Sequence, residues 1–233
     1  MLIEHQILGN DMQAVEVTMQ PGQELVAEAS TLLVMDDGIE FEAHIGDGTK
    51  SSRGVMSALG RSITGVGVFL THFHNAGSQP AKVSFTANSP GRIVPIHLPD
   101  WGGSINVEHN GFLCASKGTS LNAKRAKRIK AGVFGGSGFF LQKIEGDGTV
   151  FLHCCGSIIE RELNDDVLRC EPGAVVAFDP SIDFSIERAG NLKTMIFGGE
   201  GVFLATLRGS GKVILQSLPW GRVVSHILAQ GGK

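Results

Sequence analysis

The sequence lacks an uncharged apolar run long enough for a membrane-spanning helix, which needs about 20 residues. It also lacks an excess of one charge, because 20 Lys and Arg stand against 23 Asp and Glu in 233 residues and leave a net charge of −3. Such a balance provides no overall field that would draw the protein onto nucleic acid or an anionic membrane. The amino terminus lacks the basic segment, apolar run and cleavage site of a signal peptide. We therefore expect a cytoplasmic protein.

Cysteine is scarce, and tyrosine is absent. The four cysteines are too few and too irregularly spaced for a disulfide framework, so we expect reduced thiols. Cys154 and Cys155 are adjacent and would point to opposite faces of a strand, which prevents them from sharing a metal ion easily. Their simplest role is that of small buried hydrophobic residues.

Glycine, in contrast, is abundant, with 32 residues against only 8 prolines. It is scattered among short apolar runs, as expected for tight turns between strands. Val15, Val17 and Met19 alternate with polar residues, which predicts a strand with one buried face. Residues 175–178 are apolar in succession, as in a strand that is buried on both faces. The sequence therefore predicts an all-β fold.

One hexapeptide pattern occurs three times: GVGVFL at 65–70, GSGFFL at 136–141 and GEGVFL at 199–204. A strand, a tight turn and a second strand are predicted after each copy, and glycines at 146–148 and 209–211 favour hairpin turns in the second and third copies.

Three further glycines, Gly91, Gly156 and Gly221, are separated by 65 residues each. We interpret the pattern as an internal triplication. The prediction is one compact unit, residues 1–233, built from small β-sandwich or double-stranded β-helix repeats at about 1–98, 99–170 and 171–233.

The glycines of the hexapeptides admit two interpretations. A dinucleotide-binding loop needs a helix after the glycines, whereas here an apolar strand and a turn follow. We therefore favour a structural role in backbone packing. The structural glycines are Gly65, Gly67, Gly136, Gly138, Gly199 and Gly201.

Two segments depart from the β pattern. Residues 51–64 and 119–132 both precede a hexapeptide, and we predict a short surface helix in each, the second ending at Gly132.

Several stretches together resemble a known family. They are the opening QPGQELVAEASTLLVMDD, the segment SPGRIVPIHL, the turn region EGDGTVFLHCCG and the three hexapeptides. In these the chain is similar to bacterial proteins related to the altered-inheritance-of-mitochondria, or mitochondrial biogenesis, protein of yeast. The resemblance implies a fold similar to the tryptophan RNA-binding attenuation protein, with three β-sandwich repeats per chain in a trimeric, pseudo-ninefold ring. It implies no catalytic residues.

Assembly is also expected on physical grounds. Three small β units in one chain leave open sheet edges at both ends, and open edges invite uncontrolled pairing. A cyclic oligomer removes those edges, so we predict a homotrimer.

A histidine pair is the sharpest chemical candidate. His72 and His74 are alternate residues of a predicted strand, so both imidazoles face one side and could bind a metal ion as in cupins. No carboxylate follows them in residues 75–79, which favours surface or packing histidines instead.

A run of basic residues is the second candidate. Lys124, Arg125, Lys127, Arg128 and Lys130 would place positive charge over most of a helix and could contact phosphates or an anionic head group. The run contains no aromatic residue for stacking on bases, so a solvated helix is the simpler interpretation.

These observations favour a non-enzymatic assembly or scaffold protein with no cofactor. It would form a ring-like oligomer whose edges and loops are offered to protein partners. A small-molecule or metal-binding, cupin-like protein that uses His72 and His74 is the alternative. RNA or membrane binding through residues 124–130 is the least favoured hypothesis of the three.

Overall fold

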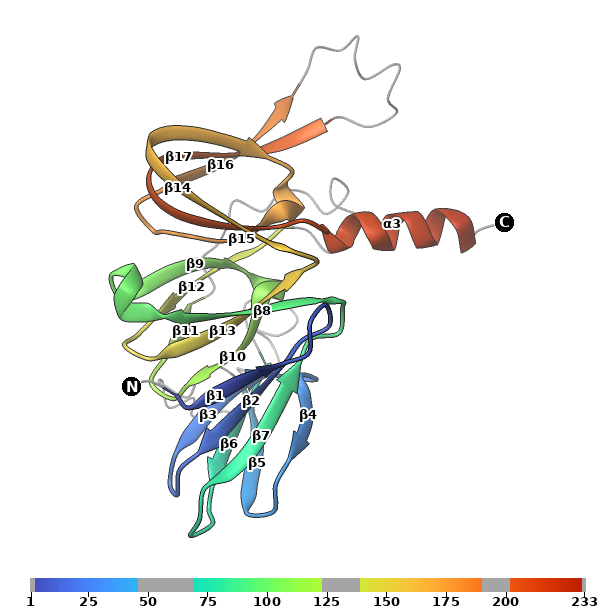
Figure 1. The fold of residues 1–233 in the computed structure, drawn as a ribbon. Helices are drawn as coiled ribbons and strands as arrows, with labels where there is room; N and C mark the ends of the chain where they lie inside the picture. Colours follow the sequence, from blue (N-terminus) through green and yellow to red (C-terminus); the bar gives the residue numbers. More distant parts are fainter. Residues whose placement is uncertain (1–2, 46–68, 123–138, 190–201, 232–233) are drawn as a thin grey trace.

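The computed structural model describes residues 3–45, 69–122, 139–189 and 202–231, and its strands form three layers that are stacked along one axis (Figure 1). The first layer contains β1 His5–Leu8, β2 Ala14–Met19, β3 Glu24–Glu28, β4 Leu32–Met35, β5 Ile39–Ile45, β6 Phe69–Asn75 and β7 Ala81–Thr86. The second contains β8 Gly91–His97, η1 Leu98–Trp101, β9 Ser104–Glu108, η2 His109–Gly111, β10 Phe112–Ser116, β11 Ser120–Asn122, β12 Leu141–Glu145 and β13 Thr149–Cys155. The third contains β14 Ile158–Cys170, η4 Pro172–Ala174, β15 Val175–Phe178, β16 Asp183–Ala189, β17 Val202–Gln216 and the helix α3 Trp220–Gly231. The prediction of an all-β fold is confirmed.

Antiparallel pairing joins these strands into three sheets, and two of the sheets continue from one layer into the next. The strand orders are β1-β2-β7-β4, then β5-β6-β3-β10-β13-β8, then β11-β12-β9-β15-β17-β14 with β16 on β17. The first junction between layers is the pair β3–β10, with Ala27 opposite Cys114. The second is β9–β15, with Val107 opposite Ala177. Each junction makes neighbouring layers share a sheet.

Three apolar clusters form the core, each centred on one layer, and two of them extend into neighbouring layers. Val15, Val17 and Met19 are fully buried in the first core, as their alternation predicts. Phe178 and Phe184 stack in the third core with ring centroids 5.3 Å apart. The two faces of each layer are held together by burial of these side chains, which is the main favourable contribution to folding.

The same pairing scheme is found in all three layers. The first strand of the scheme (β2, β8 or residues 158–163 of β14) pairs with the sixth (β7, β13 or residues 211–216 of β17). The second strand (β3, β9 or residues 166–170 of β14) pairs with the fifth (β6, β12 or residues 205–209 of β17). The third strand (β4, β10 or β15) pairs with the other edge of the sixth, and the fourth (β5, β11 or β16) with the other edge of the fifth.

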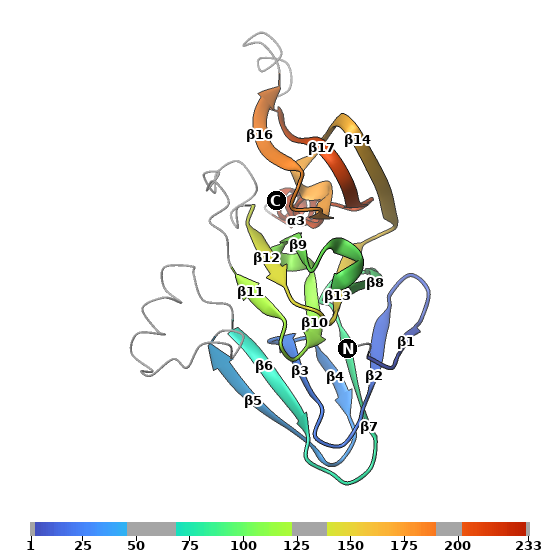
Figure 2. The same cartoon turned by 90° about the vertical axis from the view of Figure 1, so that its left-hand side faces the viewer.

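The predicted hairpins after the hexapeptides are wrong. β6 and β7 belong to different sheets, and so do β12 and β13, so the chain turns a corner from one sheet to another. In the third layer the predicted turn at 209–211 is the middle of the single strand β17. Gly209 adopts a φ of +119° there, and β14 has an irregularity between Leu163 and Asp166 opposite it. These features let both strands bend through the corner without ending (Figure 2).

The predicted helices need a further correction. Residues 51–64, and residues 123–132 of the second segment, lie outside the described part of the chain. Ser120–Asn122, which the second prediction included, form β11 and pair with β12. Leu121 packs against the core of the second layer, and its pairing and burial outweigh the local helical pattern.

The described residues include an α-helix that the sequence analysis did not predict. It is α3, which follows β17 and projects sideways from the third layer (Figure 1). Within the described ranges, no helix has the length and apolar character needed to cross a membrane.

Candidate functional site

His72 and His74 lie on β6, where alternation places both side chains on one face of the strand. His74 is opposite Glu24 on one side and Glu40 on the other. Its Nδ1 atom is buried and has no hydrogen-bond partner in the described structure. The predicted shared face is therefore present, and acidic residues flank it.

A metal centre needs more than this pair. In the described parts of the chain, no group of three or more His, Cys, Asp or Glu side chains is arranged to hold a metal ion. A closed zinc site needs about four ligands, and the two histidines would supply two of them. Metal binding at His72 and His74 stays a prediction.

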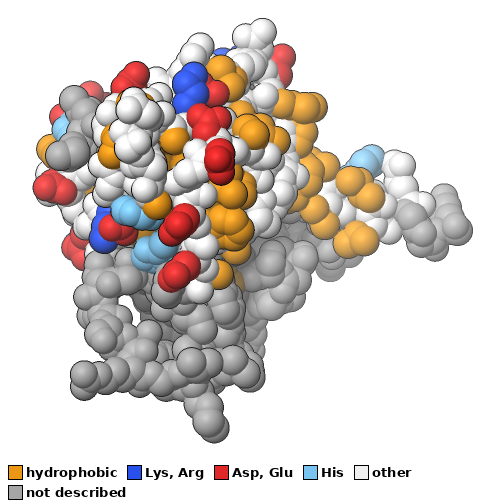
Figure 3. Space-filling view, turned by 90° about the horizontal axis from the view of Figure 1, so that it is seen from below, with side chains coloured by type: hydrophobic (Ala, Val, Ile, Leu, Met, Phe, Trp, Pro, Cys, Tyr) orange, Lys and Arg blue, Asp and Glu red, His pale blue; other side chains and the backbone are white. Residues whose placement is uncertain are grey.

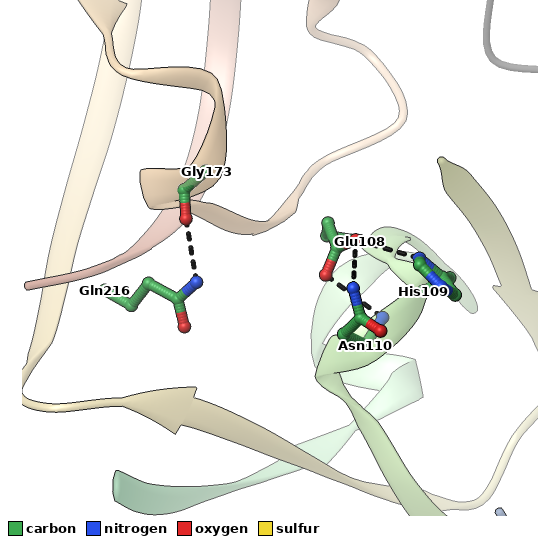
Figure 4. Close-up of polar contacts among 5 residues, drawn as sticks. All are labelled: Glu108, His109, Asn110, Gly173 and Gln216. Carbon is green, nitrogen blue, oxygen red and sulfur yellow. Dashed lines mark hydrogen bonds and ion pairs between the residues drawn. The ribbon is translucent and has the colours of Figure 1, made fainter. Parts of the chain in front are cut away.

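A polar turn lies where β9 ends, close to the end of β3. Glu108 accepts a hydrogen bond from the backbone N–H of Asn110 (3.0 Å) and pairs with His109 Nδ1 (2.9 Å) (Figure 4). Burial raises the pKa of Glu28 to about 7, while the charge of His109 lowers it and that of Glu108 raises it. Burial lowers the pKa of His109, but its bond to Glu108 and the charges of Glu108 and Glu28 outweigh this and raise it. Sequence reasoning missed this coupling because Glu28 and His109 are far apart in the chain and no local pattern links them.

Gln216 lies at another contact between layers. Its side-chain nitrogen donates to the carbonyl oxygen of Gly173 at 2.8 Å (Figure 4), and its oxygen accepts from the N–H of Cys155 at 2.7 Å. These bonds tie the end of β17 to the end of β13 and to η4. This arrangement holds the layers in place and presents no reactive group.

The cysteines have the character of packing residues. Cys114, Cys154 and Cys155 are buried, and burial raises the pKa of each thiol, that of Cys154 to about 12. A thiol with a raised pKa is a poor nucleophile. Cys170 is partly exposed, and burial together with the charge of Glu171 raises its pKa to about 11. All four cysteines are free in the structure.

The other predicted site residues lie outside the described part of the chain. They are the basic residues Lys124, Arg125, Lys127, Arg128 and Lys130 and the glycines Gly65, Gly67, Gly136, Gly138, Gly199 and Gly201. The proposals that rest on them remain predictions.

The strand β4 forms an open edge at one end of the stack. It pairs with β7 along one side, and no described strand pairs with its other side. Its apolar side chains lie at the surface, with Leu33 57% exposed and Val34 58% exposed. An apolar strand with free N–H and C=O groups is a surface that another strand can complete.

The strand β14 forms an open edge at the other end of the stack. It pairs only with β17 among the described strands. Its last residues combine polar and apolar side chains, and Val167 is 51% exposed. Figure 1 shows β14 in the layer farthest from β4. Among the described residues, the stack thus has an open strand edge at each end, β4 on the first layer and β14 on the third.

The helix α3 carries an exposed apolar stripe. Ile227 is 60% exposed and Leu228 67%, and hydrophobic side chains are visible on the projecting helix in Figure 3. Arg222 pairs with Glu171 and ties the first turn to the end of β14. The sequence carries a signal for this helix, since Val223, Val224, Ile227 and Leu228 follow helical spacing, as the helix template requires.

Comparison with known proteins identifies the family. Residues 5–218 match the family described as Mitochondrial biogenesis AIM24. An uncharacterised protein of Streptococcus pyogenes serotype M6 is 27% identical over 207 residues, which cover 88% of this chain and 81% of that protein. A crystal structure of a Streptococcus pyogenes protein has a TM-score of 0.77 at 22% identity and covers 98% of this chain and 99% of its own, which shows a shared fold. The match over nearly the whole chain means that this protein belongs to the mitochondrial biogenesis AIM24 family.

Proposed function

We propose that the protein is a non-enzymatic scaffold that assembles with copies of itself into a ring-like oligomer. The observation that carries this proposal is the apolar edge of β4, where Leu33 and Val34 are exposed although they lie within a strand. Burial of such side chains against another chain gains free energy, and closure removes an edge that would otherwise aggregate.

The two ends differ, which favours a head-to-tail assembly. β4 belongs to the first layer and β14 to the third, so contact between them joins two different surfaces. Such heterologous contacts form a ring when the rotation between copies closes. A closed ring of three chains contains nine layers and leaves neither edge open.

Triplication belongs to the same proposal. The three layers share one pairing scheme, which supports an origin by repetition of a single unit. A likeness to the ring of the tryptophan RNA-binding attenuation protein is part of this proposal and rests on the fold alone. The ring would offer its loops to protein partners.

The mass of the full-length protein in solution tests the proposal. Size-exclusion chromatography with light scattering at micromolar concentration is expected to give three times the mass of one chain. A single-chain mass across the concentration series overturns the assembly. Native mass spectrometry of the same sample, purified without chelator, gives the number of chains and the mass of anything bound.

A further inference from the structure

We propose that β4 of one copy pairs with residues 166–170 of β14 in the next copy, with Val34 opposite Cys170 and Met35 opposite Arg169. This inference rests on the proposed self-assembly and specifies the contact that would build it. The occupant of the open β4 edge is therefore a second copy of this chain.

The third strands of the three layers are equivalent. β4, β10 and β15 each pair with the sixth strand of their layer, and each register shifts at the same place. The shift lies between Leu32 and Val34 in β4, between Phe112 and Cys114 in β10, and between Val175 and Ala177 in β15. A bulge at one shared position aligns the three strands without any reference to residue type. Val34 is therefore the counterpart of Cys114 and Ala177.

In two of the three layers a strand of the preceding layer covers the third strand. β10 is covered by β3 of the preceding layer and β15 by β9 of the preceding layer. Cys114 and Ala177 are completely buried there. Val34, their counterpart in the layer that has no preceding layer, is 58% exposed. The first layer thus lacks the neighbour that its counterparts have.

The covering strand is in each case the second strand of its layer. β3 and β9 are the second strands of their layers, and residues 166–170 of β14 hold that place in the third layer. Within the described structure this part of β14 covers no third strand. The third layer therefore has an unused covering strand, and the first layer has an uncovered one.

The hexapeptides fix the register between the two. Ala27 is opposite Thr71, Val107 opposite Gln142 and Cys170 opposite Ala205. Thr71, Gln142 and Ala205 each follow the last leucine of a hexapeptide, so Ala27, Val107 and Cys170 are counterparts.

At the junctions inside the chain Ala27 is opposite Cys114 and Val107 is opposite Ala177. Cys170 is the counterpart of Ala27 and Val107, and Val34 is the counterpart of the residues opposite them. The same pairing between copies therefore places Cys170 opposite Val34. One position further along, Arg169 lies opposite Met35.

The open fourth strands do not compete for this role. β5, β11 and β16 are the fourth strands, and each forms an edge in its own layer. Their exposure is thus a property of every layer and implies no missing neighbour. β4 differs because its two counterparts are both covered.

A disulfide tests the register with a cysteine that the protein already has. Residues directly opposite in an antiparallel pair have Cβ atoms about 4.5–5.5 Å apart, close enough for mild oxidation to link them when the strands adjust slightly. We expect full-length Val34→Cys to form disulfide-linked multimers with Cys170 after oxidation, seen as a ladder on non-reducing gels. A link within one chain is prevented because β4 and β14 lie in the outermost layers (Figure 1).

Two controls make the result specific. Val34→Cys with Cys170→Ser removes the partner thiol and is expected to abolish the ladder. Phe41→Cys places a thiol of similar exposure on β5, since Phe41 is 52% exposed, and is expected to give no ladder. Circular dichroism confirms that each variant is folded.

The outcomes separate this inference from the proposed function. A ladder that requires both the Val34→Cys change and the native Cys170 supports the register. An intact oligomer in which Val34→Cys gives no more cross-linking than Phe41→Cys overturns the β4–β14 contact and leaves self-assembly standing. A single-chain mass of the unmodified protein overturns both.

Discussion

Ala27 on β3 lies directly opposite Cys114 on β10, and both side chains are fully buried. The pair lies at the junction where the first and second layers become one sheet. Val107 and Ala177 occupy the same place at the second junction. At both junctions within the chain, the second strand of one layer therefore pairs with the third strand of the next layer.

A charge on β4 should break the assembly. Val34→Glu would bury an unpaired carboxylate in the β4–β14 contact. An uncompensated buried charge costs about 3 kcal/mol of binding free energy, equivalent to about 100-fold weaker association. We expect light scattering to give a single-chain mass at concentrations where the unmodified protein is oligomeric. Phe41→Glu, on the neighbouring edge, should leave the mass unchanged, and equal effects of both changes would contradict the prediction.

The reactivity of Cys170 should report the same contact. Cys170 is the partly exposed thiol among the four cysteines, whereas the others are buried. In the assembled protein the neighbouring β4 would cover it, so a maleimide should label it slowly. We expect Val34→Glu to increase the labelling rate at least about 10-fold, as a solvent-exposed thiol reacts faster than a covered one. Cys170→Ser identifies the labelled residue, and an unchanged rate would count against the contact.

The stability of the fold should fall as the pH rises through the range set by Glu28. Its pKa is about 7 in the folded protein against an ordinary value of 4.5. Between these values the folded state keeps a proton that the unfolded state has lost, so stability decreases from about pH 4.5 to about pH 7. We expect Glu28→Gln to raise the urea midpoint at pH 8 and to change it little at pH 4.5.

His109 contributes in the same direction. Its pKa is raised in the folded state, so its stabilising contribution is present at low pH and is lost as the pH rises through that pKa. Some pH dependence should therefore remain in Glu28→Gln. A shift of the urea midpoint by the same amount at both pH values would show that Glu28 is not the titrating group.

Gly91 should tolerate no side chain. A Cβ atom there would lie 2.1 Å from the carbonyl oxygen of Cys154 and 2.6 Å from Nε2 of His153. Relief of such overlap requires backbone movement at the start of β8, so we expect Gly91→Ala to lower stability by about 3 kcal/mol. Gly221→Ala is the matched control, because nothing lies within 4 Å of its Cβ position and alanine favours a helix. Thermal unfolding compares the two, and a stable Gly91→Ala would contradict the prediction.

Metal content distinguishes the scaffold from the cupin-like alternative. Protein purified without chelator is expected to contain no metal in fixed ratio to the chain, and His74→Ala is expected to leave elemental analysis unchanged. The reason is that, among the described residues, no group of three or more His, Cys, Asp or Glu side chains is arranged to hold a metal ion at His72 and His74. One metal ion per chain that disappears in His74→Ala would move the alternative ahead of the scaffold.

Local sequence patterns were reliable where burial follows directly from alternation. Val15, Val17 and Met19 are fully buried as predicted, and residues 175–178 are buried on both faces. The turn predictions failed because glycines favour a bend whether the next strand returns to the same sheet or crosses to another. Gly146 lies between β12, which pairs with β9 and β11, and β13, which pairs with β8 and β10. No local pattern specifies those partners.

The all-β class, the positions of the glycine-rich bends and the family follow from the order of the amino acids alone, whereas the sequence predicted hairpins where the chain crosses between sheets. Which strands are covered depends on the packed layers. LLVM in β4, FLCA in β10 and VVAF in β15 are equally apolar, and nothing in their letters separates them. β10 and β15 are buried because a preceding layer supplies β3 and β9, whereas β4 stands at the start of the stack. Coverage of a sheet edge depends on residues far away in the chain, so it becomes visible only once the layers are in place.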